Sequence, residues 1–206
     1  MKNMIKDALI LFAITLIAGL ALGAVHFITE EPIRIAEEKA LNDSYREVFG
    51  NASTFEEVPG FADPQSADKT QWTAKGFDKV NINKALIAKD ASGNTLGYVF
   101  DVTSHEGYGG DIEFTMGVTA DGVLNGISLL SIKETAGLGM RAEEVLKPQF
   151  ASKPVQEFEV TKTGSTSDSQ IDAISGATIT SKAITKAVNA GLDYYSTLTG
   201  GAGNEN

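Results

Sequence analysis

The pattern of apolar and polar positions begins with a long stretch that carries no charge. Residues 8–28 read ALILFAITLIAGLALGAVHFI. As an α-helix these residues would rise about 31 Å, which matches the hydrocarbon thickness of a bilayer. The pattern therefore predicts one membrane-spanning helix near the N-terminus.

The charges that flank this stretch predict its orientation. Lys2 and Lys6 precede it, whereas Glu30 and Glu31 follow it. Because positive flanks favour the cytoplasm, we expect residues 1–30 to form a cytoplasmic N-terminus and a single span of the cell (inner or plasma) membrane. The main domain would then be extracytoplasmic. A cleaved signal peptide is the alternative, but its apolar region is usually shorter, about 7–15 residues.

Helical spacing of apolar residues continues beyond the predicted span. Pro32 suits the first turn of a helix, and Gly50 is a typical stop signal. We expect an amphipathic stalk helix over residues 31–50 that runs out of the membrane and packs on its own domain or on a partner subunit. Its apolar positions are Ile33, Ala36, Ala40, Leu41, Tyr45, Val48 and Phe49.

A period of two replaces the helical period between residues 84 and 132. Four strand-like stretches follow one another there: KALIAKD, TLGYVFDVTSH, GDIEFTMGVTA and VLNGISLLSI. Residues 92–94 and 120–122 are hairpin signals, so these stretches predict an antiparallel meander. Residues 51–82 are polar and interrupted by proline, and we expect them to be irregular.

Shorter elements complete the predicted architecture. The pattern indicates a short helix over Arg141–Phe150, a strand over Gln156–Lys162, a C-terminal helix and a disordered tail at residues 199–206. The predicted fold class is α+β: one N-terminal transmembrane helix, then an antiparallel β-sheet domain flanked by helices. That domain would occupy residues 51–198.

Composition removes several kinds of chemistry from consideration. The chain has no cysteine, which excludes disulfides, cysteine-ligated clusters and thiol catalysis. Its two histidines, His26 and His105, argue against a multi-histidine metal site. A hydrolase would have only His105 as an extracytoplasmic histidine base, and we expect His105 to be an exposed loop residue. The net charge of −10 argues against a nucleic-acid partner.

Two motifs in the sequence suggest a nucleotide or phosphate ligand. The run from Gly137 to Ala142 matches the dinucleotide fingerprint G-x-G-x-x-A, but that motif needs a parallel βαβ unit and the preceding strands are antiparallel. The second motif, SGATITS at Ser175–Ser181, precedes the C-terminal helix, and a helix N-terminus favours phosphate. Ordinary capping by Ser or Thr is the alternative, and the residues alone leave both open.

The stretch DAISGAT, from Asp172 to Thr178, resembles the flavinylation signature D-x-x-[ST]-G-A-T. That signature belongs to FMN-binding domains of the Rnf electron-transport complexes and the Na⁺-translocating quinone reductases. In this family the last threonine carries FMN through a phosphoester bond, which implies covalent attachment at Thr178. Glu134–Gly139, ETAGLG, is similar to the family's E-T-P-G-L-G with Ala136 in place of proline, and GYGG is similar to its glycine–aromatic loop.

The resemblance implies a set of flavin contacts and no catalytic acid, base or metal ligand. The implied FMN contacts are Tyr108, Glu134, Thr135, Leu138, Gly139, Ser175, Gly176, Ala177 and Thr180, with Asp172 as part of the attachment motif. The overall length and the wording GYGGDI are more similar to the G subunits of Rnf complexes than to the C subunits of the quinone reductases.

The same resemblance implies an electron carrier within a larger assembly. The chain would be one component of an ion-translocating ferredoxin:NAD⁺ oxidoreductase, with other Rnf-type subunits and membrane lipid as partners. A flavin transferase that uses FAD and Mg²⁺ would attach the cofactor. The alternatives are a component similar to the C subunits of the quinone reductases, a membrane-tethered binding or assembly module without a redox centre, and an extracytoplasmic hydrolase.

Overall fold

The computed structural model describes residues 2–200, in two compact units. The first unit ends at Ala40 and the second begins at Leu41. Helix α1 (Lys2–Val48) supplies the first unit, and its last two turns belong to the second. Residues 201–206 of the predicted disordered tail lie outside the described residues.

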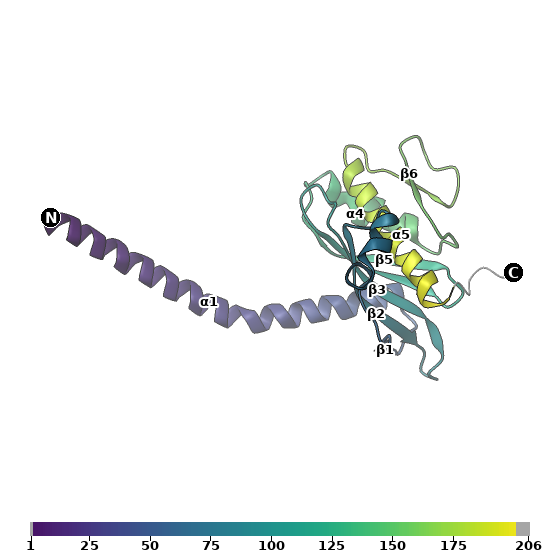
Figure 1. Ribbon diagram of the computed structural model, residues 1–206, viewed down its shortest axis with the longest axis horizontal. Helices are drawn as coiled ribbons and strands as arrows, with labels where there is room; N and C mark the ends of the chain where they lie inside the picture. Colours follow the sequence, from purple (N-terminus) through teal and green to yellow (C-terminus); the bar gives the residue numbers. More distant parts are fainter. Residues whose placement is uncertain (1, 201–206) are drawn as a thin grey trace. The chain divides into compact units, whose positions relative to one another are not determined.

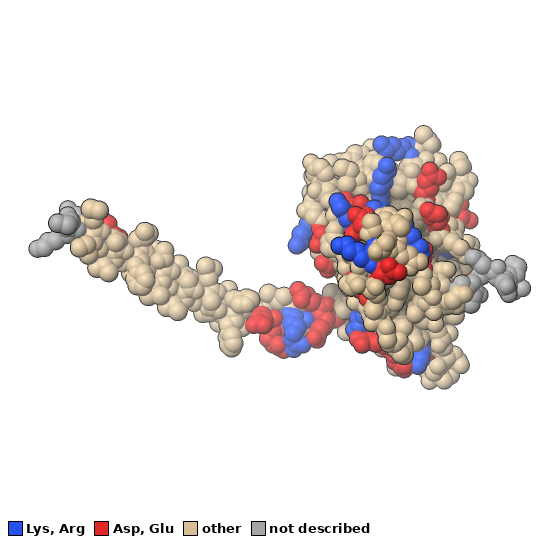
Figure 2. All heavy atoms as spheres, viewed as in Figure 1, with Lys and Arg blue, Asp and Glu red and all other residues tan. Residues whose placement is uncertain are grey.

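Helix α1 is one uninterrupted helix of 47 residues, so the residues of the predicted span and those of the predicted stalk up to Val48 belong to a single helix. Pro32 lies inside the helix and deprives the carbonyl of Ile28 of its usual N–H donor. The backbone hydrogen bonds before and after Pro32 continue the helix across this one missing bond. Residues 8–28 are exposed throughout, and α1 is long and apolar enough to cross a membrane. Figure 2 shows this stretch free of charged side chains and followed by charges of both signs.

Five antiparallel strands form the main sheet, in the order β1-β2-β3-β4-β5 (Figure 1). Their bounds are Thr54–Glu57, Val80–Lys89, Thr95–Ser104, Ile112–Thr119 and Leu124–Ile132. Strands β2 to β5 confirm the predicted meander, and the α+β fold class is confirmed with it. Strand β2 starts four residues earlier than its predicted pattern, which began at residue 84.

Helix α5 (Thr178–Leu198) covers one face of this sheet. Phe100, Phe114 and Met116 are fully buried in the core beneath it. The approach is close, because a β-carbon at Gly191 would lie 2.2 Å from the Met116 Sδ. The predicted C-terminal helix is thus held by the sheet, and its N-terminus has a fixed place in the domain.

The end of α1 covers the opposite face. Tyr45, Val48 and Phe49 are 4%, 3% and 3% exposed and pack against β2 and β3 residues. Gly97 and Gly117 leave room for the Phe49 ring, since a β-carbon at either position would lie within 3.0 Å of it. The apolar stalk residues were expected to pack either on the chain's own domain or on a partner subunit. Tyr45, Val48 and Phe49 pack on the chain's own domain.

A buried hydrogen-bond network joins α1 to the sheet. Tyr45 Oη donates to Asp101 Oδ2 at 2.6 Å, and Thr115 Oγ1 donates to Asp101 Oδ1 at 3.1 Å. Ser44 Oγ lies 2.8 Å from Thr115 Oγ1. Burial raises the pKa of Asp101, although the two donated bonds and the charge of Lys84 act in the opposite direction.

The segment expected to be irregular, residues 51–82, contains β1 and two short helices, so that prediction is wrong. Helices α2 (Pro64–Ala67) and α3 (Lys69–Ala74) have Asp63 and Asp68 as N-caps. These caps make short helices favourable despite the polar sequence. Trp72 on α3 is 4% exposed and donates its indole N–H to the Val80 carbonyl, which ties the segment to β2.

The elements after β5 are shorter than their patterns predict. In place of one helix over Arg141–Phe150, the chain forms 3₁₀-helix η1 (Gly139–Arg141), helix α4 (Ala142–Val145) and 3₁₀-helix η2 (Lys147–Phe150). Pro148 cannot donate a bond inside a continuous helix, which accounts for the interruption.

The strand predicted over Gln156–Lys162 forms only as β6 (Glu159–Thr161), which pairs in parallel with β7 (Gln170–Asp172). Just before β6, the backbone N–H and carbonyl of Phe158 bond the Asn189 side chain, both at 2.8 Å. Those groups are therefore not available to a strand partner.

Substitution Tyr45→Phe tests the buried network. Removing one donor from the Asp101 carboxylate should lower the free energy of unfolding by about 1–3 kcal/mol at neutral pH. Because the variant's Asp101 pKa is raised further, protonation relieves the cost, and the difference from the parent should shrink as the pH falls through the folded-state pKa. Urea unfolding of the full chain in detergent, followed by the single tryptophan, Trp72, measures both effects.

Tyr98→Phe is the matched control, since Tyr98 lies on the opposite face of β3 against Tyr195. A loss for Tyr45→Phe that is no larger than the control's, or that is independent of pH, would contradict the role assigned to Asp101.

Candidate functional site

Three segments that are distant in sequence meet at the N-terminus of α5. They are residues 105–110 between β3 and β4, residues 133–139 after β5, and residues 173–180 around the helix start. The Tyr108 backbone N–H donates to Glu134 Oε1 at 2.7 Å, which joins the first segment to the second. The structure thus brings together the three motifs that the sequence singled out.

The second segment approaches the third so closely that glycine is required. A β-carbon at Gly139 would lie 2.6 Å from the Glu134 Cβ and 2.7 Å from the Thr180 Oγ1. A β-carbon at Gly176 would lie 3.0 Å from the Leu138 Cδ2. Residues 134–139 therefore lie directly against the first turn of α5.

The glycine-rich segment is equally close to residues 133–134. A β-carbon at Gly109 would lie 1.9 Å from the Lys133 carbonyl oxygen, and one at Gly107 would lie 3.0 Å from Glu134 Oε1. Any side chain at Gly109 would force the two segments apart. The predicted glycine–aromatic loop owes its position to this backbone contact.

A tight turn delivers the chain into α5. Ala177 N–H donates to the Ile174 carbonyl at 2.9 Å, and Gly176 has a φ of 78°, which a turn of this kind requires at its third residue. Ser181 Oγ accepts from the Ile174 N–H at 3.0 Å and donates to the Ala177 carbonyl at 2.9 Å. The turn is therefore fixed to the helix that it begins.

The N-terminus of α5 lacks the capping that the Ser/Thr pattern had suggested as an alternative. The N-cap residue is Ala177, which makes no side-chain cap bond, and the first turn contains no acidic residue. Thr178 is the first helical residue and is half-buried. The helix start therefore favours an anion beside Thr178.

The other predicted residues of this turn differ in their access to solvent. Ser175 and Gly176 are exposed, whereas Ala177 and Thr180 are buried. Thr135 is exposed and Glu134 is half-buried. Asp172 is turned toward a polar loop, where its Oδ2 accepts from the Ser165 Oγ at 3.2 Å.

Exposed apolar side chains surround the same helix start. Among the described residues outside α1, every large hydrophobic side chain that is exposed lies in or beside these three segments. They are Tyr108, Leu138, Met140 and Ile179, at 71%, 40%, 45% and 54% exposure. Met140 and Ile179 were not predicted as site residues from the sequence, where each occupies an unspecified position of a motif. The site thus combines an apolar surface with an anion-favouring helix end.

An ion pair fastens the glycine-rich segment to α5. Lys186 Nζ lies 2.9 Å from the carboxylate of Glu106, and both side chains are about one-third exposed. The sequence offered no signal for this pair, because eighty positions separate the two residues. The pair brings a positive charge two turns along the helix from Thr178.

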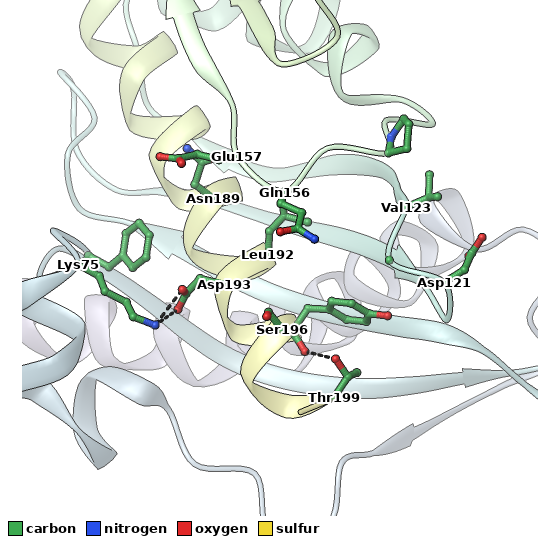
Figure 3. Close-up of a pocket in the computed structure, with 14 residues that line it drawn as sticks. Lys75, Asp121, Val123, Gln156, Glu157, Asn189, Leu192, Asp193, Ser196 and Thr199 are labelled. Carbon is green, nitrogen blue, oxygen red and sulfur yellow. Dashed lines mark hydrogen bonds and ion pairs between the residues drawn. The ribbon is translucent and has the colours of Figure 1, made fainter. Parts of the chain in front are cut away.

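A cavity lies elsewhere, against the C-terminal half of α5 (Figure 3). It has a volume of about 590 Å³ and includes the ion pair between Lys75 and Asp193, whose atoms are 2.8 Å apart. None of the predicted site residues lines it. The candidate site therefore lies at the opposite end of α5 from this cavity.

The dinucleotide fingerprint has no matching architecture. Residues Gly137–Ala142 follow the antiparallel strand β5, contain the three-residue helix η1 and end at the first residue of α4. A parallel βαβ unit around this motif, which the fingerprint needs, does not occur in the described part of the chain. Gly139 instead serves the contact with α5.

The family models that match this chain include one that spans the candidate site. The FMN-binding domain family matches residues 107–193, which includes all three segments from Gly107 onward. The family described as RnfG N-terminal region matches residues 1–48, which include the whole of α1. The two matches together cover residues 1–48 and 107–193.

Two relatives match almost the whole chain. The G subunit of the Na⁺-translocating ferredoxin:NAD⁺ oxidoreductase complex of Acetobacterium woodii is 32% identical over 200 residues, covering 96% of this chain and 94% of the relative. The G subunit of the proton-translocating ferredoxin:NAD⁺ oxidoreductase complex of Clostridium ljungdahlii is 34% identical over 204 residues, covering 95% and 97%. Among solved structures, Shewanella oneidensis NqrC is similar with a TM-score of 0.47 and 17% identity, over 58% of this chain and 62% of that chain.

Substitution Gly139→Ala tests the contact at the centre of the site. The added methyl group should displace residues 134–139 from α5 and lower the free energy of unfolding by about 1–3 kcal/mol. Thermal or urea unfolding followed by Trp72 fluorescence measures the change. Gly50→Ala is the control, because its β-carbon would meet only the Arg46 carbonyl oxygen at an ordinary 3.5 Å. Equal stability of the two variants would contradict the close contact.

Proposed function

The chain belongs to the family of G subunits of ion-translocating ferredoxin:NAD⁺ oxidoreductase (Rnf) complexes, and from this premise we propose that it is a membrane-anchored electron-transfer protein that carries covalent FMN. The observation that carries the proposal is that three segments meet at the start of α5, where Thr178 lies between Gly176 and Thr180, the two residues that residues 138–139 approach. FMN, when bound, supplies reversible electron transfer.

The residues present fit both ends of FMN. The phosphate end would lie at the start of α5, where the helix has neither a side-chain cap nor an acidic residue in its first turn. The flavin ring would lie on the apolar side chains of Tyr108 and Leu138, which are otherwise exposed to water. The close glycine contacts keep these two parts of the site adjacent.

Thr178 is the hydroxyl best placed for the phosphoester. Thr180 and Ser181 are 1% and 0% exposed, and Ser181 already accepts one hydrogen bond and donates another. Ser175 lies in the turn before the helix. Only Thr178 combines partial exposure with a place in the first helical turn.

A flavin transferase would attach the cofactor from FAD with Mg²⁺. The Thr178 Oγ forms a bond to the phosphorus of the FMN moiety, its proton is lost, and AMP leaves. Partial exposure of Thr178 gives such an enzyme access to the hydroxyl. Asp172 faces Ser165 rather than Thr178, so a role for Asp172 would lie in shaping the recognised segment.

The remaining residues would act by placement. Glu134 holds the loop of Tyr108 through the 2.7 Å bond to its backbone N–H, and Gly139 allows Leu138 to lie against Gly176. No side chain is assigned as an acid, base or nucleophile during electron transfer. The domain would lie outside the cytoplasm and be anchored by α1. Outside the cytoplasm, FMN lost by dissociation could not readily be replaced, so covalent attachment would retain it.

Substitution Thr178→Ala tests the attachment. The full chain, co-expressed with a competent flavin transferase, should give a band in denaturing electrophoresis that fluoresces yellow under ultraviolet light. The variant band should be dark because it lacks the hydroxyl. Mass spectrometry of a peptide spanning residues 172–182 should show one added FMN, less water, in the parent only.

Two companion variants define the result. Thr178→Ser keeps a hydroxyl and should retain measurable loading, and Thr197→Ala removes a hydroxyl at the other end of α5 and should load fully. A dark parent band would reject covalent FMN, and a fluorescent Thr178→Ala band would reject this attachment residue.

A further inference from the structure

The ion pair between Glu106 and Lys186 joins the glycine-rich segment directly to α5. Lys186 Nζ lies 2.9 Å from both carboxylate oxygens of Glu106. Among the described residues, no other hydrogen bond or ion pair links residues 105–110 to α5. The pair therefore connects the segment that bears Tyr108 to the helix whose first residue is Thr178.

Both partners of this pair are held in place. Their side chains are 31% and 29% exposed, so water and salt screen the attraction less than they would screen a pair on the open surface. The Glu106 backbone N–H donates to the Ser104 Oγ at 3.4 Å, and Ser104 is fully buried at the end of β3. Glu106 is thus held by the sheet through its backbone and by α5 through its side chain.

The loop that follows Glu106 is compact, which couples Tyr108 to the pair. A β-carbon at Gly107 would lie 2.2 Å from the Gly110 carbonyl oxygen and 3.0 Å from the Ile112 Cγ1. The Tyr108 side chain is 71% exposed, so packing of its own ring contributes little to its position. The place of that ring is therefore set by the backbone around it, which begins at Glu106.

The proposed function fixes the phosphate end of FMN to α5 at Thr178. The ring end would contact Tyr108, whose loop is tied to the same helix by Lys186. We infer that Glu106 and Lys186 are positioning residues that set where Tyr108 lies relative to the flavin ring. The inference rests on the proposed function only where it concerns FMN, since the contact between loop and helix exists without it.

Charge exchange separates the pair from its individual members. Lys186→Glu alone places a second carboxylate opposite Glu106, and the two negative charges repel. The repulsion moves Glu106 from α5, and Tyr108 moves with it. Glu106→Lys combined with Lys186→Glu restores the attraction with the charges exchanged, so only an effect of the pair itself is reversed in the double variant.

Backbone amide NMR of the FMN-free Thr178→Ala full chain in detergent tests the positioning without the cofactor. The Tyr108 amide signal should shift in Lys186→Glu. Lys186→Gln removes the attraction without adding repulsion, and it should shift the signal in the same direction by a smaller amount. The exchanged pair should return the signal toward its position in the parent.

Lys75→Glu is the matched control for a reversed charge. Lys75 pairs with Asp193 of α5 at 2.8 Å, and the two side chains are 37% and 30% exposed, but this pair holds α3 and not the glycine-rich segment. The control should leave the Tyr108 amide signal unchanged. Urea unfolding followed by Trp72 fluorescence shows that each variant is folded.

The FMN-loaded chain supplies the functional readout. The quantity measured is the flavin emission of the folded chain divided by the emission of the same sample after denaturation, which corrects for loading. Because a tyrosine ring in contact with a flavin quenches its emission, Lys186→Glu should raise this ratio and the exchanged pair should lower it again. Tyr108→Leu should also raise it, and adding Lys186→Glu to Tyr108→Leu should cause no further rise.

A Tyr108 amide signal that stays in place in Lys186→Glu and Lys186→Gln, or a shift that the exchanged pair leaves unreversed, overturns the inference. A further rise of the emission ratio in the Tyr108→Leu background also overturns it, because the pair would then act by another route. A chain that takes no FMN yet shows the reversible amide shift supports the positioning role and rejects the proposed function. A loaded chain without the amide shift does the reverse.

Discussion

The site depends on how closely residues 134–139 approach the first turn of α5. That approach is possible because residue 139 is glycine. A β-carbon at this position would lie 2.7 Å from the Thr180 hydroxyl oxygen. Leu138 is thereby brought to Gly176, and Glu134 remains in reach of the Tyr108 N–H. If residues 134–139 moved away from α5, the apolar side chains would no longer lie beside the anion-favouring helix end. A flavin nucleotide, which has a ring system and a phosphate, needs both features next to each other.

Helix α5 both packs on the sheet and forms part of the site, which holds this contact in place. Its buried face packs on Phe100, Phe114 and Met116, while Thr178 and Ile179 in its first turn remain accessible to solvent. The other face of the sheet is covered by the end of α1, where Tyr45 bonds the buried Asp101. Both layers fix the sheet, so the loops that carry function are placed by a scaffold that does not itself take part.

The glycine-rich loop shows how a flexible composition acquires a defined position. Its backbone lies against Lys133, its Tyr108 N–H bonds Glu134, and its base is bridged by the His105 ring. The Glu106–Lys186 pair adds a link to α5. These contacts come from residues 133–134, from β2 and from α5, so several parts of the domain position the loop while the Tyr108 side chain stays exposed.

The sequence by itself determined the apolar span, the four-strand meander, the C-terminal helix and the family, because periodicity and short motifs are local properties. It could not determine that α1 continues through Pro32, that Asp63 and Asp68 cap helices in a polar segment, or that β6 pairs in parallel with β7. It also gave His105 no role beyond an exposed loop residue. Those features were decided by tertiary contacts, since a helix interruption, a strand partner and the donors and acceptors around a side chain depend on groups far away in the chain.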